Sequence, residues 1–173
     1  MAGSPPRCWD RSSQHLLRHA HGPAVVVRDV PKSATRVVVG VDPETAEPAL
    51  SAAFEAASAR DLPLIVVHAW RLPPFGGPGL GVPAAGIDAD TIESSRRRAV
   101  QEVVRTWAAK SPDVAVEVRL VRQHPAHALI EASIDSALTV VGSRGRGGFN
   151  GLLLGSTSSA VAAHAHSPVL VAR

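Results

Sequence analysis

The chain has 173 residues, which is enough for one α/β domain of about 140–150 residues and a short additional segment. Its net charge of +3 and pI of about 10.0 come from arginines that are scattered rather than clustered, so we expect no nucleic-acid partner. No apolar run approaches the roughly 18 residues of a membrane helix, and the single cysteine, Cys8, excludes an intramolecular disulfide. The first residues lack the apolar region of a signal peptide, and we therefore expect a cytoplasmic protein with no membrane partner.

The N-terminal part of the chain contains a segment that repeats the C-terminus. Residues Ser13–Arg28 and Ser158–Arg173 align without a gap at an offset of 145, and seven of the sixteen positions are identical. We interpret residues 1–28 as the tail of a preceding copy of the same domain, with coincidence between two helices rich in alanine and histidine as the alternative. The predicted remnant has a helix at 12–21 and a strand at 24–28, and a linker to residue 33 leads into a domain at 34–173.

Beyond residue 34, short valine-rich runs alternate with alanine-rich segments of helical spacing. Unbroken apolar runs are typical of strands that are buried on both faces of a parallel sheet. We therefore predict an α/β fold with a doubly wound, five-stranded parallel sheet and right-handed crossovers. The predicted strands are 36–41, 62–70, 114–121, 138–141 and 169–172, the predicted helices are 46–60, 88–110, 126–136 and 156–166, and the proline- and glycine-rich segment 71–87 is a predicted loop.

Asp42 directly follows the first predicted strand of this domain. One interpretation makes Asp42 the N-cap of the next helix, with Pro43 at the first helical position. The other places its carboxylate at the carboxyl end of a parallel strand, where open α/β sheets bind ligands and where it could accept hydrogen bonds from a ribose or adenine. The two interpretations are compatible. His68, near the end of the second strand, is interpreted as a packing residue because no metal-ligand set accompanies it.

The most informative stretch is 138–156, in which a short apolar run leads into six glycines between Gly142 and Gly155 and then into a predicted helix. Ser156 or Thr157 is available as the N-cap of that helix. A strand, a glycine loop and a helix start place bare backbone N–H groups and a positive helix end around a phosphate. The spacing matches neither a Walker A loop nor the dinucleotide-binding fingerprint, and on glycine content alone a flexible loop is an equal alternative.

Taken together, the motifs of residues 34–173 resemble those of the universal stress protein family. The resemblance lies in Val39-Gly40-Val41-Asp42, in Val67-His68-Ala69-Trp70, in the Ser-Pro-Val-Leu-Val ending, and above all in Gly142-x2-Gly145-x9-Gly155-Ser156. The long glycine motif is specific in this context, whereas no part of it alone would be.

The resemblance implies a flavodoxin-like (Rossmann-like) sheet of strand order 3-2-1-4-5 and the binding of ATP, with or without Mg²⁺. Asp42 and Ala69 would then line the adenosine pocket. The ribose and phosphates would be held from the glycine loop and the helix after it, by Gly142, Gly145, Gly155, Ser156 and Thr157, with Arg144 of the same loop as a further candidate.

The sequence also departs from the family pattern at three places. Pro43 stands where a glycine is frequent, Gln123 replaces a glycine, and Ser136-Ala137-Leu138 lacks the usual acidic residue before the strand. None of these departures touches the glycine motif, so the expectation of ATP binding stands, and the details of the pocket edge differ.

The leading hypothesis is an ATP-binding stress-response protein that acts through partners rather than as an efficient enzyme. No obvious water-positioning carboxylate accompanies the glycine loop, which supports slow hydrolysis at most. Because family members dimerise through the last strand, the resemblance implies a homodimer, or pairing of the leftover strand at 24–28 with 169–172. The alternatives are a dimerisation or interaction module without nucleotide and, less favoured, a nucleotide-dependent transferase.

Overall fold

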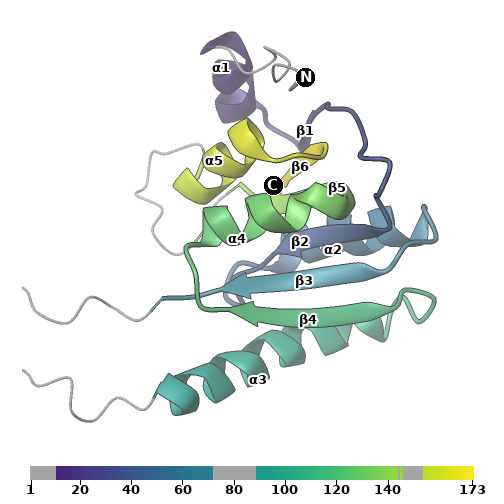
Figure 1. Ribbon diagram of the computed structural model, residues 1–173, viewed down its shortest axis with the longest axis vertical. Helices are drawn as coiled ribbons and strands as arrows, with labels where there is room; N and C mark the ends of the chain where they lie inside the picture. Colours follow the sequence, from purple (N-terminus) through teal and green to yellow (C-terminus); the bar gives the residue numbers. More distant parts are fainter. Residues whose placement is uncertain (1–10, 72–88, 144, 146–153) are drawn as a thin grey trace, which may run out of the picture.

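A computed structural model describes residues 11–71, 89–143, 145 and 154–173. These residues form one six-stranded sheet with helices on both faces (Figure 1). In chain order the elements are α1 (Arg11–His19), β1 (Ala24–Val26), β2 (Arg36–Gly40), α2 (Glu47–Ser58), β3 (Leu64–Ala69), α3 (Ala89–Ala108), β4 (Val116–Val121), α4 (Pro125–Ala132), a 3-10 turn (Ser133–Asp135), β5 (Ser136–Gly142), α5 (Ser156–His164) and β6 (Val169–Ala172).

The strand order across the sheet is β1-β6-β5-β2-β3-β4. Strands β2 to β6 are mutually parallel and, when numbered within the domain, follow the order 3-2-1-4-5 that the family resemblance implied. The prediction of a purely parallel, five-stranded sheet was wrong in one respect, since β1 adds a sixth strand that runs antiparallel to β6. This pairing confirms that the N-terminal strand has the last strand as its neighbour.

Alternating side chains of each strand pack into two apolar layers, as the period of two along a strand requires. Val37 and Val39 of β2 face a cluster formed with α2 and α3, whereas Val38 faces a cluster formed with α4 and α5. In Figure 1, α4 and α5 lie in front of the sheet and α2 lies behind it. Burial on both faces explains why the central strands consist almost entirely of apolar residues.

The N-terminal α1 and β1, which we call the arm, pack at the β6 edge of the sheet (Figure 1). Residues Ala24, Val25 and Val26 pair with Val171, Leu170 and Val169, respectively. The bounds of α1 become those of α5 when 145 is added, which is the offset of the sequence repeat. The repeat is therefore also a structural repeat, with the strand pair β1–β6 at its centre.

The start of α2 differs from the sequence-based interpretation of Asp42 as its N-cap. The helix begins at Glu47, after Ala46, and Asp42 instead closes a turn in which its Oδ1 accepts from the Glu44 N–H at 3.3 Å. The Thr45 N–H donates to the Asp42 backbone oxygen at 3.0 Å in the same turn. The Asp42 side chain is consequently held at the end of β2 rather than within the helix.

Two further expectations concern loops and membranes. The predicted loop at 71–87 lies outside the described residues except for Arg71. Among the helices that the structure describes, none is both long enough and apolar enough to cross a membrane.

Candidate functional site

The carboxyl ends of β2, β3 and β5 border a cavity of about 320 Å³. Its walls come from the turn after β2, the last residues of β3, the start of α4, and the segment that joins β5 to α5. This is the edge at which open parallel sheets bind their ligands, and the volume lies in the range of small-molecule sites. Of the site residues predicted from the sequence, those lining the cavity are Asp42, Ala69, Gly142, Gly145, Gly155, Ser156 and Thr157, while Arg144 lies outside the described residues.

The β5 and α5 side of the cavity is held together by hydrogen bonds that span the glycine segment. The Ser158 hydroxyl donates to the Gly142 carbonyl at 2.5 Å, and the Gly155 N–H donates to the Ser143 carbonyl at 2.8 Å. These contacts fix the first turn of α5 beside the end of β5. The sequence therefore brings Gly142 and Gly155 to the same place in space although thirteen positions separate them.

The N-terminus of α5 is open toward the cavity. The prediction of Ser156 or Thr157 as N-cap was wrong, because Gly155 occupies the N-cap position and provides no side-chain cap. A Cβ built on Gly145 would meet no atom of the described residues within 4 Å, so among these residues the wall there is bare backbone. Uncapped first-turn N–H groups and the positive end of the helix dipole suit an anion such as a phosphate.

His68 is a lining residue that the sequence-based interpretation assigned to packing alone. Its side chain is 3% exposed, and its Nδ1 lies 2.9 Å from the Val41 carbonyl oxygen. Because a carbonyl only accepts, Nδ1 carries the proton and donates. The contact anchors the residue immediately before Asp42. The sequence feature that could have indicated this position is a histidine near the end of an otherwise apolar strand. The carboxyl ends of parallel strands are where such sheets bind their ligands.

Helix α4 forms a further wall of the cavity, to which Pro125 and Leu129 contribute. Leu129 lies directly over Gly40, where an added Cβ would stand only 2.5 Å from the leucine Cδ1. Glycine at position 40 therefore lets α4 approach the end of β2. The histidine before the helix, His124, caps α4 by accepting from the Ala126 N–H at 3.3 Å through Nδ1.

Ionisable side chains are few among the described residues that line the cavity. Asp42 is the carboxylate in the lining and His68 is the imidazole. In the described ranges, no group of three or more histidine, cysteine, aspartate and glutamate side chains lies close enough together to hold a metal ion. The pKa of Asp113 is lowered because the Ser58 hydroxyl donates to its carboxylate, and the pKa of Glu117 is lowered by Arg119, but neither group lines the cavity.

Comparison with known proteins identifies the family. The model of the universal stress protein family matches residues 34–173. The chain belongs to the universal stress protein family. It is 39% identical over 177 aligned positions to the universal stress protein Rv2623 of Mycobacterium tuberculosis, and the match covers 98% of this chain and 57% of that protein. The chain thus spans just over half the length of the curated relatives it matches.

Two solved structures of the family are complexes with adenine nucleotides. A universal stress protein in complex with cAMP matches with a TM-score of 0.58 and 25% identity over 80% of this chain and 96% of that one. The universal stress protein of Archaeoglobus fulgidus in complex with dAMP matches with a TM-score of 0.54 and 26% identity over 80% of this chain and 98% of that one. Adenine nucleotides are therefore ligands of related proteins with this fold.

Proposed function

We propose that the cavity binds ATP and that this chain acts in stress response through nucleotide-dependent contacts with partners. The observation that carries the proposal is the convergence of Asp42, Ala69 and the two ends of the glycine segment on one cavity at the carboxyl edge of the sheet. These residues are far apart in the chain and line the same cavity. The nucleotide complexes of related structures support the same ligand class.

The two walls of the cavity suit the two ends of a nucleotide. The Asp42 carboxylate accepts from ribose hydroxyls or the adenine amine, and the backbone beside Ala69 lines the base. The phosphates meet the open N-terminus of α5 at Ser156 and Thr157 and the bare backbone of Gly142, Gly145 and Gly155, where N–H groups and the helix dipole favour negative charge. Arg144 remains a proposed phosphate ligand from the sequence.

The proposed role is binding and signalling rather than fast catalysis. Phosphoryl transfer requires a group that orients or deprotonates the attacking nucleophile beside the γ-phosphate. Asp42 stands after β2, whereas the proposed phosphate wall is formed by β5 and α5. ATP is proposed to bind with or without Mg²⁺, and a cytoplasmic location stays a prediction.

Titration of the purified full chain with labelled ATP tests this proposal. We expect saturable binding that unlabelled dAMP weakens by competition and that UTP weakens less, because the base is read beside Asp42 and Ala69. An Asp42→Ala variant should bind at least about tenfold more weakly, since a hydrogen-bonded carboxylate contributes on the order of 1.5–3 kcal/mol. A folded chain without saturable binding at millimolar ATP would favour the interaction module instead.

One observation bears on the second candidate, the dimerisation or interaction module. The sequence-based prediction of a homodimer through the last strand requires a free β6 edge, and β1 occupies that edge. A homodimer of that kind would form only if the arm left β6. A mass measurement in solution on the full chain and on a variant lacking residues 1–28 checks this, because the shortened variant alone should dimerise.

A further inference from the structure

A second pocket lies beside the proposed nucleotide cavity, on the face of the sheet that α2 and α3 cover. Its volume is about 500 Å³, and we call it the α3 pocket. The turn after β2 forms one wall, the first half of α3 forms another, and the end of β3 contributes His68. Asp42 and His68 line both spaces, so the α3 pocket and the proposed nucleotide cavity are neighbours.

Arg96 contributes a charged side chain to this pocket from a core-facing position of α3. It precedes Val100 by four residues, and Val100 and Val104 are the buried residues of this helix. Residues four apart lie on the same face of a helix. Arg96 is accordingly half-buried, whereas the adjacent Arg97 and Arg98 are exposed. The stripe of a helix that faces a sheet is normally apolar, so a guanidinium at this position requires an explanation.

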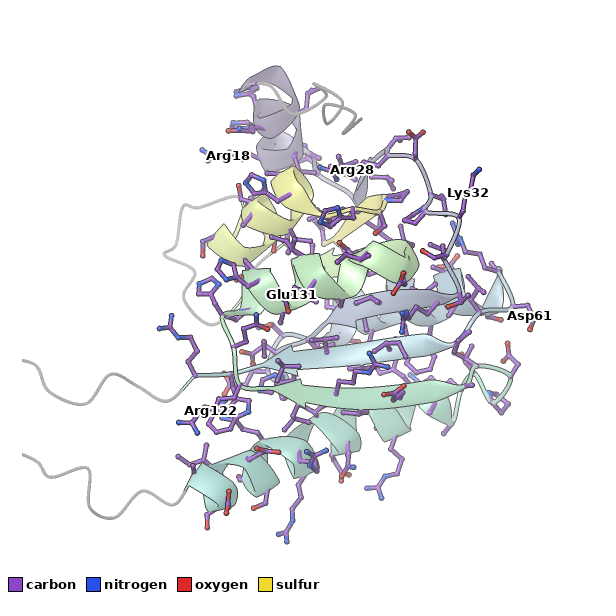
Figure 2. All side chains as sticks on the ribbon, in the orientation of Figure 1. Arg18, Arg28, Lys32, Asp61, Arg122 and Glu131 are labelled. Atoms are coloured by element: carbon purple, nitrogen blue, oxygen red, sulfur yellow. The ribbon has the colours of Figure 1, made fainter. Side chains whose placement is uncertain are left out.

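The indole ring of Trp70 holds the Arg96 guanidinium in place. Trp70 is 4% exposed, and the Arg96 Cζ lies 5.6 Å from its ring centroid, within the range of a cation–π interaction. Arg122, which Figure 2 shows at the end of β4 near the first turns of α3, lies 5.8 Å from the same centroid. The Arg96 Nε is buried and has no hydrogen-bond partner among the described residues. The cation is therefore fixed by stacking, and its donors are not saturated by the protein.

His68 is a second polar side chain at a core-facing position of the same layer. Leu64 and Val66, which precede it at a spacing of two, pack in the cluster formed with α2 and α3. Its Nδ1 donates to the Val41 carbonyl, so Nε2 of the neutral ring is an acceptor. Nε2 is buried, and the described part of the chain offers it no hydrogen-bond partner. Since a buried polar atom without a partner is destabilising, a donor supplied by an occupant of the pocket would be favourable.

We propose that the α3 pocket binds a small hydroxylated organic acid. The carboxylate would accept hydrogen bonds from the Arg96 guanidinium, and the hydroxyl would donate to His68 Nε2. Pro43 and Ile92 supply apolar lining for the carbon skeleton. An apolar wall with a few convergent polar groups is the usual composition of a small-molecule site, and this volume lies within the usual range.

The turn after β2 limits which anions fit. Asp42 and Glu44 bring two carboxylates to that wall of the pocket. The phosphates of a polyanion would be repelled there, whereas a monoanion can keep its single charge at Arg96. The inference therefore assigns the α3 pocket to a ligand other than a nucleotide, and it does not require the neighbouring cavity to bind ATP.

Calorimetric titration of the full chain with 3-hydroxyhexanoate tests the proposal. Hexanoate lacks the hydroxyl and 3-hydroxyhexanamide lacks the charge, so these two compounds are the matched ligands. We expect saturable binding of 3-hydroxyhexanoate, at least about tenfold tighter than that of either matched ligand, because each lacks one of the two hydrogen-bonded groups. Equal affinities for the three compounds would overturn the proposal. No saturable binding at millimolar 3-hydroxyhexanoate would do the same and would leave water as the occupant of the pocket.

Substitutions in α3 test the carboxylate contact. Arg96→Gln should weaken the binding of 3-hydroxyhexanoate by at least about tenfold and remove its advantage over the amide. Arg96→Lys retains the charge but not the planar fork, and should therefore retain part of the affinity. Arg98→Gln is the matched control, because Arg98 is exposed on the same helix and does not line the pocket. Equal losses in Arg96→Gln and Arg98→Gln would contradict the assigned contact.

The hydroxyl contact is tested at His68. His68→Leu should remove the preference for 3-hydroxyhexanoate over hexanoate, because it deletes the acceptor. If this variant does not fold, the nitrogen-15 resonance of Nε2 in the unmodified chain decides the same point. It should shift during titration with 3-hydroxyhexanoate and stay in place with hexanoate. Equal shifts with both acids would show that Nε2 does not accept from the hydroxyl and would overturn its assigned role.

A competition experiment separates this inference from the proposed function. We expect 3-hydroxyhexanoate to bind the full chain in the presence of saturating ATP, because the two ligands occupy different spaces. Mutual exclusion of the acid and ATP would contradict a separate site. A chain that binds the acid but not ATP would support the α3 pocket and contradict the proposed nucleotide function.

Discussion

Arg28 and Arg173 make the same contact in opposite directions, because each donates from the end of one strand to the last carbonyls of the other unit's helix. The carbonyls at a helix C-terminus have no intrahelical partner, and a guanidinium satisfies them while complementing the negative end of the helix dipole. The two arginines thereby attach the arm to the β6 edge.

Removing either arginine should loosen the arm. We expect Arg28→Ala and Arg173→Ala each to lower the free energy of arm opening by about 1.5–3 kcal/mol, the usual contribution of hydrogen bonds from a charged group. Hydrogen exchange of the α1 amides measures this opening. Lys32→Ala, in the exposed linker, is the control and should have no effect. An Arg28→Ala variant that behaves like the control would show that Arg28 does not hold the arm against the β6 edge.

Position 40 should tolerate nothing larger than glycine. A Cβ there would stand 2.5 Å from Leu129 Cδ1, so Gly40→Ala should reduce the free energy of unfolding by about 1–3 kcal/mol through overpacking. Urea unfolding measures the loss. Gly22→Ala serves as the control because a Cβ at position 22 meets no atom of the described residues within 4 Å. Adding Leu129→Val should recover part of the loss, and strictly additive effects of the two changes would argue against the predicted clash.

Substitution of Gly145 should lower ATP affinity and should not lower the stability of the fold. In the part of the chain that the structure describes, no atom lies within 4 Å of a Cβ placed at Gly145, so Gly145→Val should leave the melting temperature unchanged. It should nevertheless weaken ATP binding by at least about tenfold, because a side chain would stand between the backbone and the phosphates. Calorimetric titration of the variant with ATP gives the affinity. Wild-type affinity in a folded variant would remove Gly145 from the proposed phosphate wall.

His68 should act through the hydrogen bond that it donates to the Val41 carbonyl. His68→Leu leaves that buried carbonyl without its donor, which costs about 1–3 kcal/mol of stability, and loosens the turn that holds Asp42. His68→Asn retains an N–H close to the position of Nδ1 and should restore most of both stability and ATP affinity. If the asparagine variant had the same stability and ATP affinity as the leucine variant, His68 would be a packing residue, as its sequence context first indicated.

Sequence reasoning succeeded where a pattern is tied closely to a backbone requirement. The valine runs predicted the central strands because burial on both faces demands apolar residues throughout, and the alternation of elements predicted parallel β2 to β6. The repeat located the arm, since seven of its sixteen positions are identical to those of Ser158–Arg173. Asp42, Gly142, Gly145 and Gly155 line one cavity, as expected of parallel strands that end at the same edge, and their role in nucleotide binding stays a prediction.

The predictions that were wrong or incomplete concern features that depend on residues close in space but distant in the sequence. Gly155 rather than Ser156 occupies the N-cap position of α5, and its N–H donates to the Ser143 carbonyl, a contact between residues twelve positions apart. Ser136 looked like a mere departure from the family pattern. In the structure it is fully buried and lies 3.0 Å from the Thr139 hydroxyl and 2.9 Å from the Ser167 hydroxyl. Such a hydroxyl cluster joins residues from two strand ends, and no local pattern indicates it.

Mapping ATP onto the chain by amide hydrogen exchange tests the central claim most directly. The account predicts that ATP slows exchange in the first turn of α5, after Gly155, and in the Asp42–Thr45 turn, and that Gly145→Val abolishes both effects. The strands β1 and β4, which lie at the outer edges of the sheet, should show no change. Protection confined to another surface, or no protection at millimolar ATP in the folded chain, would contradict the assignment of this cavity as the nucleotide site.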